Sequence, residues 1–162
     1  MEEKVKASLD NARKLIKTAD HMIYMTYPMV RENRLLIKIL EEIHESLVSL
    51  VRAVLHFEYI NKRITLYRDT KANFEIFAME CANNYGISRE EVNKIRDIFN
   101  IIEKHKQSPV EFLRKDKFVI MSDNLGTETI TFDVLKSYLR IAKNVLRKTE
   151  SSLDNWKNVY KV

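Results

Sequence analysis

The sequence predicts a mostly α-helical protein, an antiparallel bundle of about five helices with one small β-hairpin before the last helix. Two observations support this fold class. The 162 residues include only two Gly and two Pro, which is few for a sheet-rich fold that needs many tight turns. Apolar residues also recur at steps of three and four along most of the chain, which is the spacing of the buried face of a helix. Because neither an internal repeat nor a change in composition is present, we expect residues 1–162 to form a single domain.

The first two helices are the most regular part of this pattern. We expect Pro28 to end the first helix shortly after Tyr27, because proline cannot continue the helical hydrogen-bond ladder. The second helix is expected from about Arg31 to Ile64, and its apolar stripe covers nearly half of the circumference. A helix that apolar is expected at the centre of the bundle. The stripe of the first helix consists of Val5, Leu9, Ala12, Ile16, Ala19 and Ile23.

The third and fourth helices carry clear end signals. Gly86 can adopt a left-handed conformation, so we expect the third helix to stop there. Ser88 then opens the fourth helix, and Glu91, three residues later, completes a capping box. The side chains expected to point inward are Phe74, Phe77, Ala78, Cys81 and Tyr85 in the third helix, and Val92, Ile95, Phe99 and Ile102 in the fourth.

The helical pattern is interrupted between the fourth helix and the last one. Ser108 to Glu111 repeats the capping pattern with Pro at the first helical position, which predicts a short helical turn. The runs KFVIM and TETIT have high β-propensity and flank the turn-forming sequence SDNLG, which predicts a hairpin. Two isolated strands are marginal in water, so this hairpin must pack on the bundle or on another subunit. The side chains expected to do so are Phe118, Ile120 and Ile130.

The last helix is expected from about Phe132 to at least Lys148, with Thr131 placed to cap it. One side of this helix is apolar, and the opposite side carries cations spaced by four, three and four residues. The inward side chains are Leu135, Tyr138, Ala142, Val145 and Leu146, and the cations are Lys136, Arg140, Lys143 and Arg147.

Composition excludes several classes of protein. A single cysteine, Cys81, allows no intrachain disulfide, and the first residues lack the apolar core of a signal peptide. No apolar run approaches the ~20 residues that span a bilayer. We therefore expect a cytoplasmic chain without a membrane partner. Both Gly residues have structural roles, so no glycine-rich loop remains to hold a nucleotide phosphate, and no cofactor is expected.

Few polar residues are candidates for chemistry. Glu41 and His44 have the spacing of one half of a di-iron motif, but the second copy is absent, so we interpret His44 as a hydrogen-bonded core histidine and expect no metal site. Cys81 lies one turn from two aromatic residues and is interpreted as a small core residue. Arg52 and His56 lie one turn apart on the polar side of the second helix, where they can bind an anion or form a solvated or interhelical polar seam.

Cations around the interruption indicate a nucleic-acid partner. The net charge is +5 and the isoelectric point is about 9.2, which is compatible with phosphate binding. Such cations are also ordinary on exposed helix faces. If the interruption and the last helix fold side by side, together they can contact the phosphates of RNA. The residues of this predicted RNA-binding face are Lys104, Lys106, Arg114 and Lys115 in the interruption, and Lys136, Arg140, Lys143 and Arg147 in the last helix.

The segment IRDIFNIIEKHKQS resembles a motif of HEPN proteins, helical bundles that include RNA-cleaving toxins, nucleotidyltransferase partners and other RNA-linked modules. In that family a late helix carries an Arg, usually followed by a polar residue such as Asn, and then a His four to six residues after the Arg. Asn100 and His105 match the second and third places, whereas Phe99 holds the place of the Arg and Arg96 lies one turn earlier. The family's Arg and His act on the scissile phosphate. The resemblance thus implies an RNA-directed bundle, with His105, Arg96 and Asn100 as the candidates for any metal-independent ribonuclease activity.

Two classes of function follow from these observations. The first is an RNA-directed, HEPN-like binding module without robust nuclease activity. The alternative is a non-catalytic helical interaction subunit that acts by self-association or by docking in a larger complex. A homodimer is expected because the hairpin has an exposed edge and because small residues share one flank of the second helix. These residues are Ser46, Ser49 and Ala53.

Overall fold

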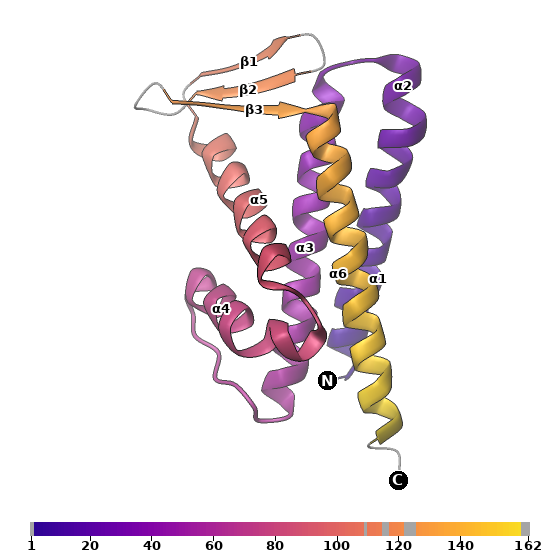
Figure 1. Ribbon diagram of the computed structural model, residues 1–162, viewed down its shortest axis with the longest axis vertical. Helices are drawn as coiled ribbons and strands as arrows, with labels where there is room; N and C mark the ends of the chain where they lie inside the picture. The colour runs from indigo at the N-terminus through magenta and orange to yellow at the C-terminus, as the bar shows by residue number, and fades with distance from the viewer. Residues whose placement is uncertain (1, 109, 115–116, 122–125, 160–162) are drawn as a thin grey trace.

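A computed structural model describes residues 2–108, 110–114, 117–121 and 126–159. The predicted fold class is confirmed: antiparallel helices form a bundle, and a small sheet precedes the last helix at one end of it (Figure 1). The elements are α1 (Glu2–His21), a π-helical turn (Met22–Thr26), α2 (Tyr27–Val30), α3 (Arg34–Ile60), α4 (Thr70–Ile76), a second π-helical turn (Phe77–Cys81), a 3₁₀ turn (Ala82–Tyr85), α5 (Arg89–Gln107), β1 (Val110–Arg114), β2 (Lys117–Met121), β3 (Thr127–Thr131) and α6 (Phe132–Val159).

The first helix does not end at Pro28, contrary to the sequence-based prediction. Helical backbone continues from α1 through the π-helical turn into α2, and it ends at Arg31, whose φ of 49° is left-handed. In the π-helical turn the N–H of Tyr27 donates to the carbonyl oxygen of Met22. A proline inside a helix lacks one donor and crowds the carbonyl four residues before it, and a widened turn relieves that crowding. We attribute the continuation to the π-helical turn directly before Pro28.

The central helix of the bundle is α3, which packs against α1, α5 and α6 (Figure 1). Its small-residue flank is buried within the subunit. Ser46 and Ala53 are fully buried, and Ser49, which is 3% exposed, accepts a hydrogen bond of 2.8 Å from the side chain of Asn11 in α1. The small side chains therefore pack this chain's own helices together, and they are not available to a second subunit. All six stripe residues of the predicted first helix, five in α1 and Ile23 in the π-helical turn, are buried as predicted.

The end signals of the third and fourth helices are confirmed. Gly86 has a φ of 70° at the end of the 3₁₀ turn. The side-chain oxygen of Ser88 accepts a hydrogen bond from the backbone N–H of Glu91, and the Glu91 carboxylate accepts one from the N–H of Ser88. Burial raises the pKa of the Cys81 thiol to about 12. Cys81 is thus a protonated core residue, as predicted.

The interruption forms a sheet of three antiparallel strands in the order β1-β2-β3. The predicted hairpin is β2 and β3, and Phe118, Ile120 and Ile130 are buried against the bundle. The helical turn predicted from Ser108 to Glu111 is wrong, because Val110 already begins β1. The Ser108 hydroxyl donates to the carbonyl of Met121 in β2, at 2.8 Å, instead of capping a helix. Pairing with β2 satisfies backbone groups that a single helical turn would leave unpaired.

The last helix begins and packs as predicted, and it extends beyond the predicted minimum at Lys148. Thr131 accepts a hydrogen bond of 3.2 Å from the N–H of Val134, which confirms the cap. α6 continues to Val159 and brings Trp156 onto the rings of Phe57 and Tyr85. Among the described residues, none of the helices has the length and apolar character needed to span a membrane.

Candidate functional site

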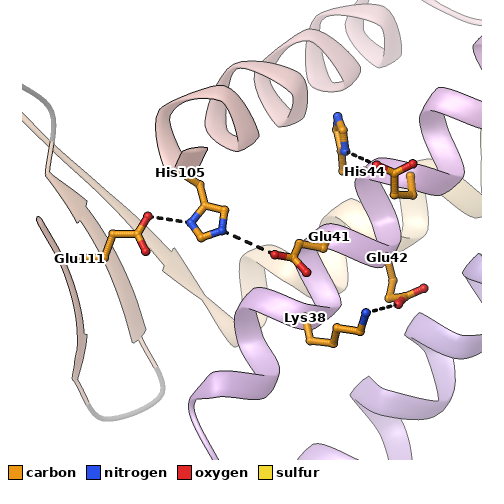
Figure 2. Close-up of polar contacts among 7 residues, drawn as sticks. Lys38, Glu41, Glu42, His44, His105 and Glu111 are labelled. Atoms are coloured by element: carbon orange, nitrogen blue, oxygen red, sulfur yellow. Dashed lines mark hydrogen bonds and ion pairs between the residues drawn. The ribbon is translucent and has the colours of Figure 1, made fainter. Parts of the chain in front are cut away.

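His105 lies on the last turn of α5, between two carboxylates (Figure 2). Its Nδ1 is 2.6 Å from Oε1 of Glu111 in β1, and its Nε2 is 3.5 Å from Oε1 of Glu41 in α3. The ring packs edge-on against Phe118 at 5.7 Å, and the side chain is only 19% exposed. His105 therefore bridges α5, α3 and the sheet, and it does not stand at an open helix end.

The three residues that match or approach the HEPN motif do not meet in one site. Arg96 and Asn100 line a cleft on α5, whereas His105 is absent from the lining of that cleft. The guanidinium of Arg96 bonds to the Glu75 carboxylate and lies over the Phe74 ring, 5.2 Å from its centroid. Because its neighbours already engage Arg96, it is not free to replace the missing Arg of the motif.

Cations near His105 are interspersed with acids. Lys104 pairs with Glu128 in β3 at 2.7 Å, close to the carboxylates that hold His105. Lys106 points instead to the cleft. The side chain of Arg114, like the whole of Lys115, lies outside the described residues. In the described part of the chain, the surroundings of His105 are thus mixed in charge and are not a continuous basic surface.

The cations of α6 contact a different part of the molecule. Lys136 lies 4.6 Å from the ring centroid of Phe132 and 6.0 Å from that of Tyr24, and Lys143 pairs with Asp20. Both cations thus face the first helical run. Two more residues of the stripe, Arg140 and Arg147, are exposed and form no ion pair with any described residue. The contacts of this stripe do not bring it together with Lys104 and Lys106 in one surface.

A cleft of about 820 Å³ lies between α3, α4 and α5, with Leu66 contributed by the segment before α4. The apolar side chains that line it are buried or half-buried, and most of the ionisable ones are exposed; we call the first group the floor of the cleft and the second group its rim. The floor consists of Val48, Val51, Leu55, Leu66, Phe74, Phe99 and Ile102, and the ionisable side chains around it are His44, Arg52, His56, Lys71, Glu75, Arg96, Glu103 and Lys106.

Positive charge at the rim is only partly compensated. Lys71 lies 3.6 Å from the Glu103 carboxylate, and Arg96 is paired as described above. Arg52 and Lys106 are exposed and form neither an ion pair nor a hydrogen bond with another described residue. Arg52 comes from α3 and Lys106 from α5, so uncompensated cations stand on two different walls of the cleft. Such a rim attracts anions.

His44 forms part of the cleft wall and is not a fully enclosed core residue. Its ring stands edge-on to Phe99, with centroids 5.2 Å apart, and its Nδ1 is 3.5 Å from Oε1 of Glu45 (Figure 2). Burial lowers the pKa of His44; Glu45 opposes this shift and Lys106 adds to it. The imidazole is therefore neutral near pH 7, and it presents an aromatic ring with one donor and one acceptor. Among the residues that the structure describes, no cluster of three or more His, Cys, Asp or Glu is placed to hold a metal ion.

An apolar floor with a few polar groups at the rim is the usual composition of a pocket for a small organic ligand. Here the rim adds uncompensated cations, so the best-fitting ligand has a flat apolar part and an anionic part. Sequence reasoning identified Arg52 and His56 as a line that can bind an anion. It missed the opposite wall, because Phe74 and Phe99 are distant in sequence and each also fits the pattern of a core residue.

No protein-family model matches this chain, and comparisons with curated proteins and with solved structures find no significant similarity.

Proposed function

We propose that this protein is an RNA-directed helical binding module, HEPN-like in layout, and that the cleft between α3 and α5 is its binding site. The observation that carries this proposal is the pair of uncompensated cations, Arg52 and Lys106, on two walls of one cleft. Phosphate binding by Lys and Arg releases the counterions of the nucleic acid and is the main source of sequence-independent affinity. A guanidinium on one wall and an ammonium on the other suit neighbouring phosphates of one strand.

The surroundings of His105 favour binding without robust nuclease activity. Cleavage of RNA requires a proton-transfer group within reach of the reacting atoms and a cation near the charge that develops on the phosphate. Here Glu41 and Glu111 engage both ring nitrogens of His105, and carboxylates so close repel a phosphate. The place of the motif's Arg is held by Phe99, whose ring belongs to the apolar floor of the cleft.

Two double variants that remove equal charge test the location of the site. Arg52→Ala with Lys106→Ala removes the cleft cations, and Arg140→Ala with Arg147→Ala removes two exposed, unpaired cations of α6. In fluorescence anisotropy with labelled single-stranded RNA at several salt concentrations, the cleft variant should bind roughly tenfold more weakly at low salt. The slope of the logarithm of its binding constant against the logarithm of the salt concentration, the salt slope, should fall in magnitude by about 1.4. Each of the two lost phosphate contacts contributes about 0.7 for a single strand.

The α6 variant is the matched control and should bind like the unmutated protein. An equal or larger loss in the α6 variant would place the site on the basic stripe and not in the cleft. Absence of binding by the unmutated protein below roughly 100 μM at low salt, where non-specific contacts register, would reject the RNA-directed function.

A second candidate function, that of an interaction subunit, is favoured by an exposed apolar patch at the end of the first helical run. Tyr24, Met25, Met29 and Val30 are 55%, 54%, 82% and 58% exposed. Met25 and Met29 are one helical turn apart, and methionine side chains adapt readily to a facing surface. Since Ser46, Ser49 and Ala53 are buried within the subunit, this patch is the surface on which we base the proposed homodimer.

Sedimentation of the unmutated protein and of Met29→Glu tests this candidate. At tens of micromolar, a modest interface of about −6 to −8 kcal/mol populates the dimer. The glutamate should return the protein to a monomer, because a dimer in which the same patch meets itself would bury two carboxylates. A monomer at this concentration without any substitution would reject self-association.

A further inference from the structure

We infer that the cleft accepts one unpaired base of a single-stranded RNA, held against Phe99, while the neighbouring phosphates lie on Arg52 and Lys106. This inference deepens the proposed function and rests on it. It distinguishes the protein from a binder of RNA helices, which reads only backbone and shape.

Phosphate binding alone does not account for the apolar floor of the cleft. Phosphate contacts need cations on a fixed surface, whereas this cleft is also lined by the seven buried or half-buried apolar side chains of the floor. Its volume of about 820 Å³ lies within the range of pockets that enclose small organic ligands. A ligand that contacts both the apolar floor and the cations of the rim carries a flat, apolar group next to an anion, as a nucleotide does.

Aromatic rings from α3, α4 and α5 lie together in the lining of the cleft. Phe99 is half-buried and lines the cleft, with Phe74 on one side at 5.1 Å between ring centroids and His44 on the other at 5.2 Å. Arg96 covers Phe74, so Phe99 and the neutral His44 ring are the surfaces that a base can meet. Proteins that bind single strands use aromatic rings in this way, because every base offers a π-face.

A polar side chain lies beside these aromatic rings and can contact the edge of a base. Asn100 is exposed, lines the cleft next to Phe99 and forms no hydrogen bond with another described residue. Its amide can donate to and accept from the edge of a base. By contrast, Asn73, which also lines the cleft, is engaged by the backbone N–H and carbonyl of Tyr67. Asn100 is therefore the side chain that we assign to the base edge.

Double-stranded RNA does not present this combination. Its bases are paired and stacked, and the edges accessible in its grooves cannot enter a recess between two helices. The inference therefore predicts a preference for single strands at equal phosphate number.

The test compares three ligands of equal length on the unmutated protein: a single-stranded RNA, a blunt duplex and an abasic oligonucleotide. The single strand should bind roughly 5- to 150-fold more tightly than the abasic chain, which is the range for loss of one stacked base. Equal affinity for the single strand and the abasic chain, or for the single strand and the duplex, would overturn the inference. Neither comparison requires a variant to fold.

A pair of variants then locates the base. Phe99→Leu keeps the wall apolar and removes the ring, and Phe132→Leu is the matched control, because Phe132 is a half-buried ring on α6 outside the cleft. Phe99→Leu should lose affinity for the single strand with an unchanged salt slope, whereas Phe132→Leu should lose none. Asn100→Ala, at an exposed position, should cause a smaller loss in the same direction.

The experiments distinguish failure of base binding in the cleft from failure of the proposed RNA-directed function. If Arg52→Ala with Lys106→Ala weakens binding while Phe99→Leu and Asn100→Ala do not, the cleft binds phosphates only and this inference is wrong, although the proposed function stands. If no RNA of any kind binds, the proposed function itself is wrong.

Discussion

Two regions along α3 combine cations with aromatic rings, and they differ in whether the charges are matched. Near the C-terminus of α3, Glu58 accepts a hydrogen bond of 2.9 Å from the Tyr85 hydroxyl, and its other carboxylate oxygen forms an ion pair of 2.8 Å with Nε of Arg63. The guanidinium of Arg63 also lies 4.8 Å from the ring centroid of Trp156. We call Glu58, Arg63, Tyr85 and Trp156 the Glu58 cluster. In the cleft, by contrast, Arg52 and Lys106 share the lining with Phe74 and Phe99, and neither cation forms an ion pair with a carboxylate of the described residues.

This difference separates a structural region from a binding region. Glu58 is 3% exposed, and burial of an ionised carboxylate is costly unless its oxygens are paired. Burial and the Glu58 carboxylate raise the pKa of Tyr85, so its hydroxyl stays protonated and donates. The polar groups of the Glu58 cluster thus bond to one another, and the cluster joins α3 to α6. The cleft cations Arg52 and Lys106 remain available to bind a ligand.

Breaking the Glu58 cluster should have the largest effect on stability. Glu58→Ala leaves Arg63 and the Tyr85 hydroxyl without their partner, and removal of one member of a buried pair costs about 3–5 kcal/mol. We expect the low end of that range, about 3 kcal/mol, because the Arg63 side chain is 36% exposed and water can replace part of the contact. Urea unfolding followed by the fluorescence of the single Trp measures it. A loss below about 1 kcal/mol would show that the cluster does not stabilise the fold.

Adding a carboxylate next to Arg52 should neutralise the cleft in the way that Glu58 neutralises Arg63. His56→Glu places a carboxylate one helical turn from Arg52, as Glu58 faces Arg63. RNA affinity should fall roughly tenfold, because a paired guanidinium no longer attracts phosphate. Stability should change by no more than about 0.5 kcal/mol, as is usual for a substitution at a partly exposed site. His56→Gln, which removes the imidazole without adding charge, is the control, and similar losses in both variants would contradict this explanation.

The smallest expected effect concerns His44 and pH. Its pKa is lowered in the folded protein, so the unfolded chain binds the proton more readily. The stability that depends on a neutral His44 is fully present above the pKa of His44 in the unfolded chain, about 6.5. It is lost as the pH falls through the lower pKa of His44 in the folded protein. Between pH 7 and pH 5 the unmutated protein should therefore lose more stability than His44→Gln, by less than about 1 kcal/mol.

Thermal unfolding across this pH range measures the difference. His21→Gln, at an exposed position on α1, is the control and should keep the pH profile of the unmutated protein. The charged groups that act on His44 are Glu41, Glu45 and Lys106. Parallel profiles for His44→Gln and the unmutated protein would show that the burial of His44 carries no stability.

Much of the fold could be predicted because its signals are local. Gly86, the Ser88 capping box and the Thr131 cap act within one turn of the chain, and all three are confirmed. The Pro28 prediction failed because helix termination depends on whether a widened turn precedes the proline. The prediction at Ser108 failed because pairing with β2 competes with a local cap, and propensity does not contain the partner strand.

The candidate site could be predicted only in pieces. Arg52, His56 and Lys106 were identified as cations or anion-binding residues from the sequence, but nothing in the sequence places them around one cleft. His105 shows the opposite outcome. Its flanking lysines predicted a basic surface, whereas the fold brings Glu41 from α3 and Glu111 from β1 to its ring. Glu111 lies only six residues from His105 and already diluted the basic pattern in the sequence, but its contact with the ring depends on β1. Glu41 comes from α3, so the local charge pattern could not reveal it.

The sequence by itself determined the fold class, most of the helix ends and the inward faces, because hydrogen-bonded caps and helical periodicity are interactions between residues a few positions apart. Only the tertiary structure decided which charges are neutralised. It buried the small residues of α3 against this chain's own helices, paired Lys143 with Asp20 and held His105 between two carboxylates. It left Arg52 and Lys106 beside an apolar floor and without an ion-pair partner among the residues that the structure describes. Electrostatic interactions act between side chains that are close in space, and the packing of the helices decides which side chains those are.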